Sequence, residues 1–230
     1  MLSELATVLE AVTALAPRGN YSRAIIEDNC LAKPTLSTRK LTNQRLGELY
    51  ALDDHVPLFR VLYRLWRADE SGLPLLAILC ALARDPLLRA TASIVVLTPL
   101  DAEFVRGPVK EALRSKVGVR LNDAILDKVV RNIASSWTQS GHLQGRTFKF
   151  RRLVRATPAS LALSVYLGHV AGLRGNELLA SGWTAVLDCS ISKAQELALE
   201  AKRLGFIDLR IGGDVLELNF DRLDPQRTKG

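Results

Sequence analysis

Cysteine, methionine and aromatic residues are scarce in this chain. Among 230 residues there are three cysteines and one methionine, and aromatic residues make up 6%. Because Cys30, Cys80 and Cys189 lie far apart, they fit free thiols of a cytoplasmic protein better than a disulfide framework. With so few aromatic side chains to stack on unpaired bases, recognition of single strands is disfavoured.

Long apolar runs are also missing. The apolar run 73–82 is shorter than the roughly 18 residues that a membrane-spanning helix needs, and Arg84 and Asp85 close it. The first 16 residues carry Glu4 and Glu10 and no basic region, which argues against a signal peptide. Because 48% of the residues are hydrophobic and 24% are charged, we expect a globular protein with a real core and no membrane contact.

The motifs of common active sites are absent as well. There is no P-loop, no Gly-x-Ser-x-Gly elbow and no dinucleotide-binding fingerprint. His55, His142 and His169 are scattered, and none pairs with a cysteine or a carboxylate at metal-ligand spacing. We therefore expect no enzymatic activity, no cofactor and no metal site.

Acidic residues are missing from one long segment of a basic protein. The 49 residues from Lys128 to Asn176 contain no Asp or Glu and carry eight cations. The net charge of this segment is +8, the net charge of the rest of the chain is −1, and that of the whole chain is +7. A solvated face normally mixes both signs, so an acid-free basic segment of this length indicates a surface that meets phosphate.

Helical patterns dominate, and two β-hairpins interrupt them. The predicted helices cover residues 2–15, 20–31, 37–51, 56–68, 73–83, 86–96, 101–106, 108–116, 122–139, 158–171, 175–187 and 191–204. The predicted hairpins pair 147–150 with 152–154, and 206–211 with 215–220 across the Gly212-Gly213-Asp214 turn. The fold class is mainly α, a helical bundle built around helix-turn-helix or winged-helix modules with two short hairpins.

The first candidate module spans residues 21–50 within an N-terminal helical domain, 1–106. Lys33-Pro34 stops one helix, and Thr35 or Ser37 can cap the next. The outer side of that second helix carries polar side chains that can bind phosphates or base edges: Arg39, Lys40, Asn43 and Gln44. The alternative is a plain helical hairpin with a solvated face.

The second candidate module, residues 107–157, is the most informative. Asn122 can cap a helix whose inner face carries Ile125, Leu126, Val129, Ile133 and Trp137 and whose outer face carries Lys128, Arg131, Asn132, Ser135 and Gln139. A basic hairpin follows, in which Phe148 and Phe150 alternate with cations, so one face would pack and the other would hold phosphates through Arg146, Lys149, Arg151, Arg152 and Arg155. A helix followed by a hairpin is the order of a winged helix; the alternative is a solvated hairpin on a helical protein.

The third candidate module, residues 158–230, has the shape of a winged helix without its charge. Ser190 or Ser192 can cap a helix that ends at Gly205, and the Gly-Gly hairpin follows. From Ile191 to Gly230 there are seven cations and seven anions. Because Glu196 and Glu200 would repel phosphate, we expect this module to contact protein or to support the fold.

Three stretches resemble the BrxA family of BREX phage-defence systems. They are Glu27-Asp28-Asn29-Cys30-Leu31 leading to Ser37-Thr38-Arg39-Lys40, Leu58-Phe59-Arg60 with Leu65-Trp66, and the capped helix of 121–143 that runs into Trp137-Thr-Gln-Ser-Gly-His-Leu143. The resemblance implies a small helical DNA-binding protein, encoded beside a methyltransferase, an ATPase and an alkaline-phosphatase-like protein. It places Ser37, Thr38, Arg39 and Lys40 in an N-terminal helix-turn-helix, and it does not extend to the C-terminal Gly-Gly hairpin.

Three functions fit these observations. The first is a non-catalytic accessory that binds double-stranded DNA and other proteins of a bacterial defence complex. The second is a helical scaffold whose basic face meets an acidic protein partner. The third is an RNA-binding protein, which the shortage of aromatic residues makes less favoured.

Overall fold

The computed structural model describes residues 1–118, 121–212 and 215–225. The fold is mainly helical, with two small two-stranded antiparallel sheets, as the sequence predicts. In the part of the chain that the structure describes, no helix is long and apolar enough to cross a membrane. One cluster of buried apolar side chains runs from Leu5 to Leu223, so all three candidate segments contribute to a common core.

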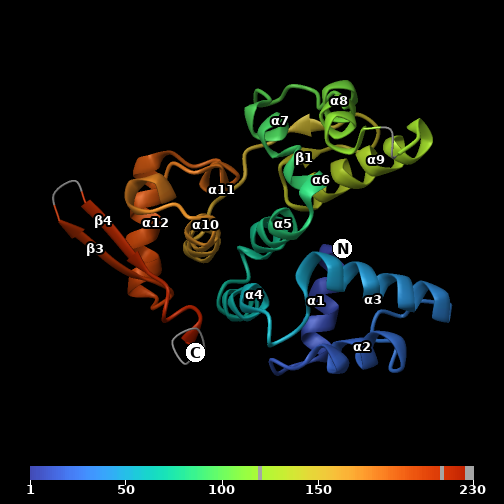
Figure 1. Cartoon of the computed structure of the whole chain (residues 1–230), viewed down its shortest axis with the longest axis horizontal. Helices are drawn as coiled ribbons and strands as arrows, with labels where there is room; N and C mark the ends of the chain where they lie inside the picture. The colour runs from blue at the N-terminus through green and yellow to red at the C-terminus, as the bar shows by residue number, and fades with distance from the viewer. Residues whose placement is uncertain (119–120, 213–214, 226–230) are drawn as a thin grey trace.

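Five helices form the N-terminal part: α1 (Leu2–Ala11), α2 (Arg18–Ile26), α3 (Leu36–Tyr50), α4 (Pro57–Ala68) and α5 (Leu73–Arg84). Thr35 caps α3, because its side chain accepts a hydrogen bond from the Thr38 amide at 3.2 Å. α3 packs against both α2 and α5. In Figure 1, α1, α2 and α3 form a lobe at one side of the molecule.

Two helices are apolar on nearly every side and occupy the centre. α5 buries every residue from Leu75 to Leu82, and α10 (Pro158–Val170) buries every residue from Ala159 to Gly168. A helix without a polar face is stable only inside a protein. α10 packs against α4, α5 and α12 (Ile191–Arg203), and Figure 1 shows α5 and α10 between the outer parts of the molecule.

The middle of the chain holds α6 (Pro86–Arg89), α7 (Ala92–Leu97), α8 (Arg106–Val117), α9 (Asp123–Gln139), β1 (Leu143–Gln144) and β2 (Phe150–Arg151). β1 pairs antiparallel with β2. Residues 101–104 run along the other edge of β2, where Glu103 and Phe150 form an antiparallel bridge. β2 therefore lies between β1 and residues 101–104.

The C-terminal part continues from α10 through the 3₁₀ helix η2 (Gly175–Leu178), α11 (Gly182–Ala185), α12, β3 (Asp208–Gly212) and β4 (Val215–Asn219). β3 pairs antiparallel with β4, with Leu209 opposite Leu218. The predicted C-terminal hairpin is thus confirmed. Gly213 and Asp214 of its predicted turn lie outside the described residues.

The other predicted hairpin is wrong in the segments that it pairs. Residues 147–149 belong to the connection between the strands, and β2 pairs with β1 rather than with 152–154. The predicted helix 101–106 is also wrong, because its first four residues bond to β2 instead: Phe104 N donates to Lys149 O at 2.7 Å. Asp101 has a φ of 63°, which no helix permits.

Two predicted helices are each divided in two. Within 86–96, the Thr91 hydroxyl donates to Leu88 O at 2.7 Å and closes a turn between α6 and α7. Within 175–187, the Ser181 side chain accepts a hydrogen bond from Thr184 N at 3.2 Å and starts α11 anew after η2. In both places a hydroxyl competes with the continuous helix for backbone groups.

Candidate nucleic-acid interface

The outer face of α9 is the most basic helical surface of the acid-free segment. Asn122 caps the helix, because its Oδ1 accepts a hydrogen bond from Ile125 N at 2.9 Å. Leu126, Val130, Ile133, Ala134 and Trp137 are buried on the inner face, while Lys128, Arg131, Asn132 and Ser135 are exposed on the other. The predicted division of α9 into an inner apolar face and an outer polar face is confirmed except for Ile125, which is 46% exposed.

Two carboxylates at the start of α9 are held by cations of α8. Lys110 Nζ lies 2.8 Å from Asp127 Oδ1 and 3.5 Å from Asp123 Oδ1, and Arg114 also pairs with Asp123. The hydrogen bond from Lys110 lowers the pKa of Asp127. Within the described residues, no carboxylate lies at ion-pair distance from Lys128 or Arg131. Neither cation is held in an ion pair, although Arg131 contributes to the lowered pKa of Asp127, one turn earlier in α9.

The β1–β2 loop, residues 145–149, follows α9 and is tied back to it. Lys149 Nζ donates to Thr138 Oγ1 at 2.9 Å and to Gly145 O at 3.0 Å. Lys149 is half-buried, so it holds the loop against α9 more than it extends outward. Arg146 is exposed, with no carboxylate of the described chain at ion-pair distance.

Arg151 does not have the orientation that the sequence pattern predicts. Its side chain is 2% exposed, and it donates to Val95 O at 2.9 Å and to the backbone oxygen of Arg152. It also forms an ion pair with Asp188, which is nearly as buried. The alternation is inverted, since Phe148 is 63% and Phe150 38% exposed. The prediction that Arg151 holds a phosphate is therefore wrong, and we exclude Arg151 from the interface.

The remaining two cations of the predicted hairpin differ from each other. Arg152 pairs with Asp101 and donates to Gln144 Oε1 at 2.8 Å, so an acid from outside the acid-free segment neutralises it. Arg155 is exposed, and it lines a surface hollow together with Lys193 and Glu200. Arg155 can reach an anion, although in surroundings of mixed charge.

In the N-terminal lobe, two of the four predicted contacts are already used within the fold. Arg39 donates to the backbone oxygens of Lys33 and Ile26, both at 3.2 Å, and Asn43 Oδ1 accepts a hydrogen bond from Arg18 at 2.7 Å.

Two other predicted contacts of this lobe, Lys40 and Gln44, are exposed on α3, and Gln44 donates to Glu48 at 2.8 Å. Arg45, which sequence reasoning missed, is exposed beside them. Its position next to Gln44 in the same helix was the available signal.

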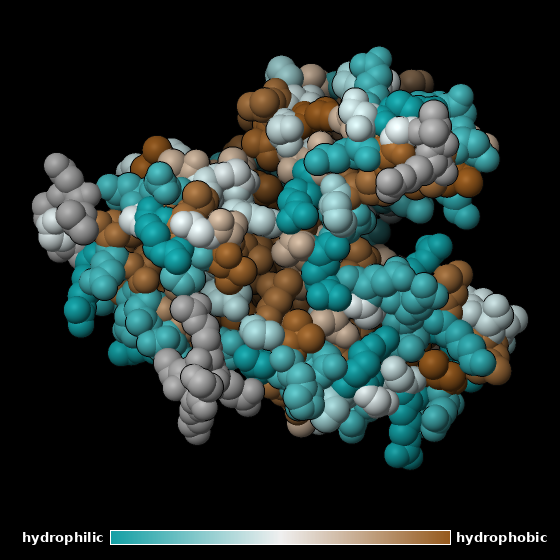
Figure 2. All heavy atoms as spheres, in the orientation of Figure 1, coloured by the Kyte–Doolittle hydropathy of each residue, from teal (hydrophilic) through white to brown (hydrophobic). Residues whose placement is uncertain are grey.

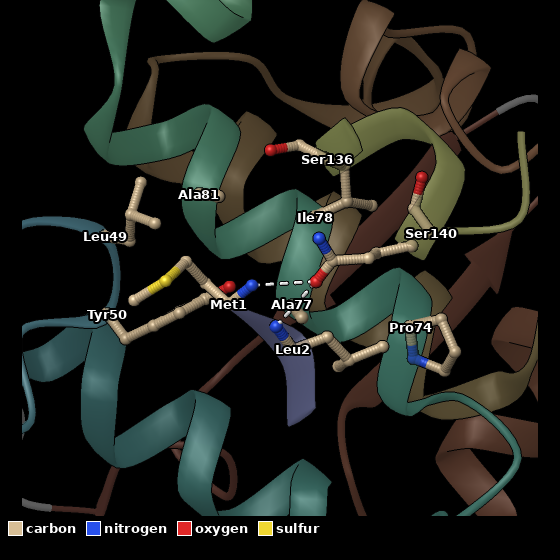
Figure 3. Close-up of a pocket in the computed structure, with 11 residues that line it drawn as sticks. Met1, Leu2, Leu49, Tyr50, Pro74, Ala77, Ile78, Ala81, Ser136 and Ser140 are labelled. Carbon is tan, nitrogen blue, oxygen red and sulfur yellow. Dashed lines mark hydrogen bonds between the residues drawn. The ribbon is translucent and has the colours of Figure 1, made fainter. Parts of the chain in front are cut away.

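Gln139, at the end of α9, is bound by the start of the chain. Its Oε1 accepts hydrogen bonds from the Met1 amino group at 2.8 Å and from Leu2 N at 2.9 Å (Figure 3). The adjoining pocket has a volume of about 30 Å³, which is space for one water molecule rather than for a ligand. Gln139 therefore fixes α1 to α9.

α3 and α9 border an open notch. Figure 2 shows this notch between the lobe of α1–α3 and the part that holds α8 and α9, with hydrophilic residues on both sides. The pocket around Met1 is lined by residues of α3, α5 and α9, which come together there. α3 and α9 carry the side chains that the sequence predicts to contact bases, and both helices border this notch.

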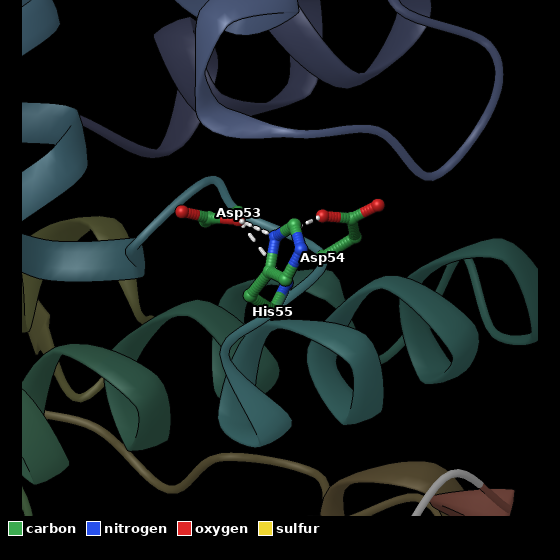
Figure 4. Close-up of side chains that lie close together, drawn as sticks. All are labelled: Asp53, Asp54 and His55. Carbon is green, nitrogen blue, oxygen red and sulfur yellow. Dashed lines mark hydrogen bonds and ion pairs between the residues drawn. The ribbon is translucent and has the colours of Figure 1, made fainter.

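Asp53, Asp54 and His55 form a group that could hold a metal ion, which sequence reasoning missed (Figure 4). Their ligand atoms lie within 4.8 Å of one another, and the His55 ring lies 3.1 Å from Asp53 and 2.8 Å from Asp54. The hydrogen bond to Asp53 raises the pKa of His55. Asp53 also accepts the backbone amide of His55 at 3.1 Å, so the group has a structural role as a turn between α3 and α4.

The surface of α12 mixes both signs. Lys193 Nζ lies 2.7 Å from Glu196, and Arg222 lies 3.0 Å from Asp208 of β3. These pairs neutralise Lys193 and Arg222, whereas Lys202 and Arg203 of α12 are exposed with no carboxylate of the described chain at ion-pair distance.

Comparisons with known proteins do not add a relative. No protein-family model matches the chain, and no curated protein and no solved structure matches it significantly. The resemblance to the BrxA family stays a prediction from the short motifs that carry it.

Proposed function

We propose that this protein binds double-stranded DNA through a winged-helix module formed by residues 101–157. In this arrangement α9 enters the major groove and the β1–β2 loop lies along the flanking backbone. The observation that carries the proposal is the exposed outer face of α9, where Lys128, Arg131 and Asn132 lie together and neither cation has a carboxylate of the described chain at ion-pair distance. Arginine and lysine bind phosphates and guanine edges, and asparagine can bind adenine.

The order of elements supports the same proposal. α8 and α9 pack against each other, β1 and β2 follow α9, and residues 101–104 precede α8 and pair with β2. In a winged helix, a short strand before the second helix lies beside the hairpin that follows the third. We extend the module to residue 101 because the pairing with β2 requires that segment.

We assign α2 and α3 to a second DNA contact, of the helix-turn-helix kind. Lys40, Gln44 and Arg45 supply its exposed polar side chains. The notch between α3 and α9 supports a shared interface, since both helices border it. We assign support or a protein contact to the C-terminal module, because residues 191–230 carry seven cations and seven anions, and Lys193 and Arg222 are held in ion pairs.

We propose further that the protein acts as an accessory without enzymatic activity of its own, together with other proteins of a phage-defence complex of the BREX type. The resemblance in sequence supports this context. The absence of nuclease, methyltransferase and ATPase turnover in the purified protein would agree with it. Turnover that a single substitution abolishes in the folded protein would contradict it.

The direct test measures duplex affinity against salt concentration for the wild type and for Lys128→Ala with Arg131→Ala. Removing one phosphate contact lowers the slope of log K against log salt by about 0.9, so the slope of the double variant should be smaller by about 1.8. Lys202→Ala with Arg203→Ala is the matched control, because it removes two exposed cations from α12. The control should leave the slope unchanged.

Three outcomes would overturn the proposal. The first is a wild type that binds RNA but not duplex DNA, and the second is a slope that Lys128 and Arg131 do not affect. The third is no nucleic-acid affinity at all.

That third result would favour the scaffold function, which has an observation of its own. An apolar groove of about 480 Å³ lies between α7 and α11, lined by Val96, Trp183 and the 79% exposed Leu97.

A further inference from the structure

The β1–β2 loop presents an aromatic side chain to solvent. Phe148 is the last residue of the exposed stretch 144–148, and 63% of its surface is exposed. The core of the protein does not use this ring, although burying it would be favourable. A single exposed apolar side chain is common, so the groups around this ring decide what it can bind.

The backbone of the loop is closed at its base. Gln144 lies opposite Phe150 in the β1–β2 register, and Phe150 is bridged on its other side to Glu103. Gly145 has a φ of 123°, and a Cβ atom there would lie only 2.0 Å from Phe148 O. Glycine alone permits this close approach, which fixes the backbone that carries Phe148. The hydrogen bonds from Lys149 to Thr138 and Gly145 hold the same turn in place. The backbone beneath the exposed ring is therefore fixed.

Most charged side chains beside the ring are cationic. Phe148 lines a hollow of about 270 Å³ together with Val105, Arg106 and Lys149. Arg106 and Arg146 are exposed, and Glu103 is the acid that lines the hollow. An aromatic ring among cations matches the chemistry of a nucleic acid, which offers base faces between phosphates. An apolar protein groove would not need these cations.

We propose that Phe148 is a wedge that stacks on a base at a disrupted step of the duplex, so that the protein prefers DNA with an unpaired or bulged base to fully paired DNA. Apolar side chains that enter the minor groove separate neighbouring bases, and this costs least where pairing is already broken. The inference rests on the proposed winged-helix function. It names the substrate class for that site and a residue that determines specificity.

The experiment compares two duplexes of the same length and sequence, one fully paired and one with a single bulged base that is 2-aminopurine. Stacking on one base should make the wild type bind the bulged duplex about tenfold tighter. The fluorescence of the 2-aminopurine should change in the complex as the base stacks on the ring. Phe148→Ala should abolish both the preference and the fluorescence change, whereas Phe148→Trp should retain both.

The matched control is Leu153→Ala, which removes an apolar side chain of similar exposure, 65%, just after β2. It should leave the preference intact. The salt slope should be the same in all four proteins, because no cation is changed.

A wild type that binds both duplexes equally, with the expected salt slope, would overturn the wedge and leave the DNA-binding function standing. So would a Phe148→Ala variant that keeps the preference. Loss of a protein partner without any change in DNA preference would assign Phe148 to protein docking instead. Failure of the wild type to bind either duplex would overturn the proposed function itself.

Discussion

Replacing Arg151 by alanine should unfold the protein more readily without weakening its DNA contact directly. Arg151 is 2% exposed and pairs with Asp188, whose side chain is 6% exposed. Asp188 also accepts a hydrogen bond from Val154 N at 3.1 Å. Removing Arg151 leaves this buried carboxylate without its cation, and breaking a buried pair in this way costs about 3–5 kcal/mol. The melting temperature of a protein of this size should fall by about 10 °C.

Urea unfolding followed by circular dichroism measures this decrease in stability. The matched control is Arg152→Ala at the next position, whose pair with Asp101 is 40% and 78% exposed and should contribute at most about 1 kcal/mol. Arg151→Met with Asp188→Asn should recover much of the stability, because no unpaired charge stays buried. Asparagine tolerates the φ of 52° at this position, and its side-chain oxygen can still accept from Val154 N. The buried geometry is refuted if Arg151→Ala keeps the wild-type midpoint and loses duplex affinity, since Arg151 would then point to the phosphates.

Three further predictions concern stability. Burial lowers the pKa of His142 to about 4; the unfolded state therefore binds the extra proton, and stability should fall by up to about 3 kcal/mol as the pH drops from about 6.5 to 4. Urea midpoints across this range should show that fall in the wild type and a flatter curve in His142→Gln. Asp224→Ala should cost about 3–5 kcal/mol, because Arg60 Nε and Nη2 bind its oxygens at 2.7 and 2.8 Å in a buried site; an unchanged chemical-denaturation midpoint would contradict this. Gly145→Ala should lower the melting temperature, because it adds about 1–3 kcal/mol of strain, whereas Gly107→Ala, with nothing within 4 Å of its Cβ, should not.

The sequence predicts the helices well where their apolar pattern is regular. α4 and α9 follow their predicted ranges closely, and the C-terminal hairpin is where its alternating residues indicate. The pattern is weakest over short pieces. Residues 101–106 are too few for a period to separate helix from strand, and their pairing partner, β2, lies almost fifty residues further along the chain.

The same long-range pairing decides which side of the hairpin is cationic. β2 has only two residues, so its pattern alone cannot fix which side chain points inward. Its position between β1 and residues 101–104 turns Arg151 inward and leaves Phe150 partly exposed. The sequence prediction instead paired 147–150 with 152–154 and placed the phenylalanines on the packed face, so it assigned the opposite orientation to Phe150 and Arg151.

The acid-free segment illustrates a limit of charge counting along a chain. No acid lies within 128–176, yet Asp101 and Asp188 from outside the segment neutralise Arg152 and Arg151. Sequence separation does not measure distance in space, so a run of cations gives only an upper bound on free positive charge. On α9 this upper bound comes closest to the charge that is actually free. The inner face of α9 packs on the core, and its two acids, Asp123 and Asp127, pair with cations of α8.

The strength of DNA binding follows from the cations that stay free. Of the eight in the segment, five are exposed with no carboxylate of the described chain at ion-pair distance: Lys128, Arg131, Arg146, Arg155 and Arg174. Arg174 lies outside the proposed module and donates to the backbone oxygens of His169 and Leu173, which leaves four cations for the interface. Four phosphate contacts give a salt slope of about 3.6, against about 7 for all eight. A module with the smaller slope loses less affinity as salt rises and depends more on other contacts. α3 across the notch and the exposed ring of Phe148 are the contacts that this structure offers.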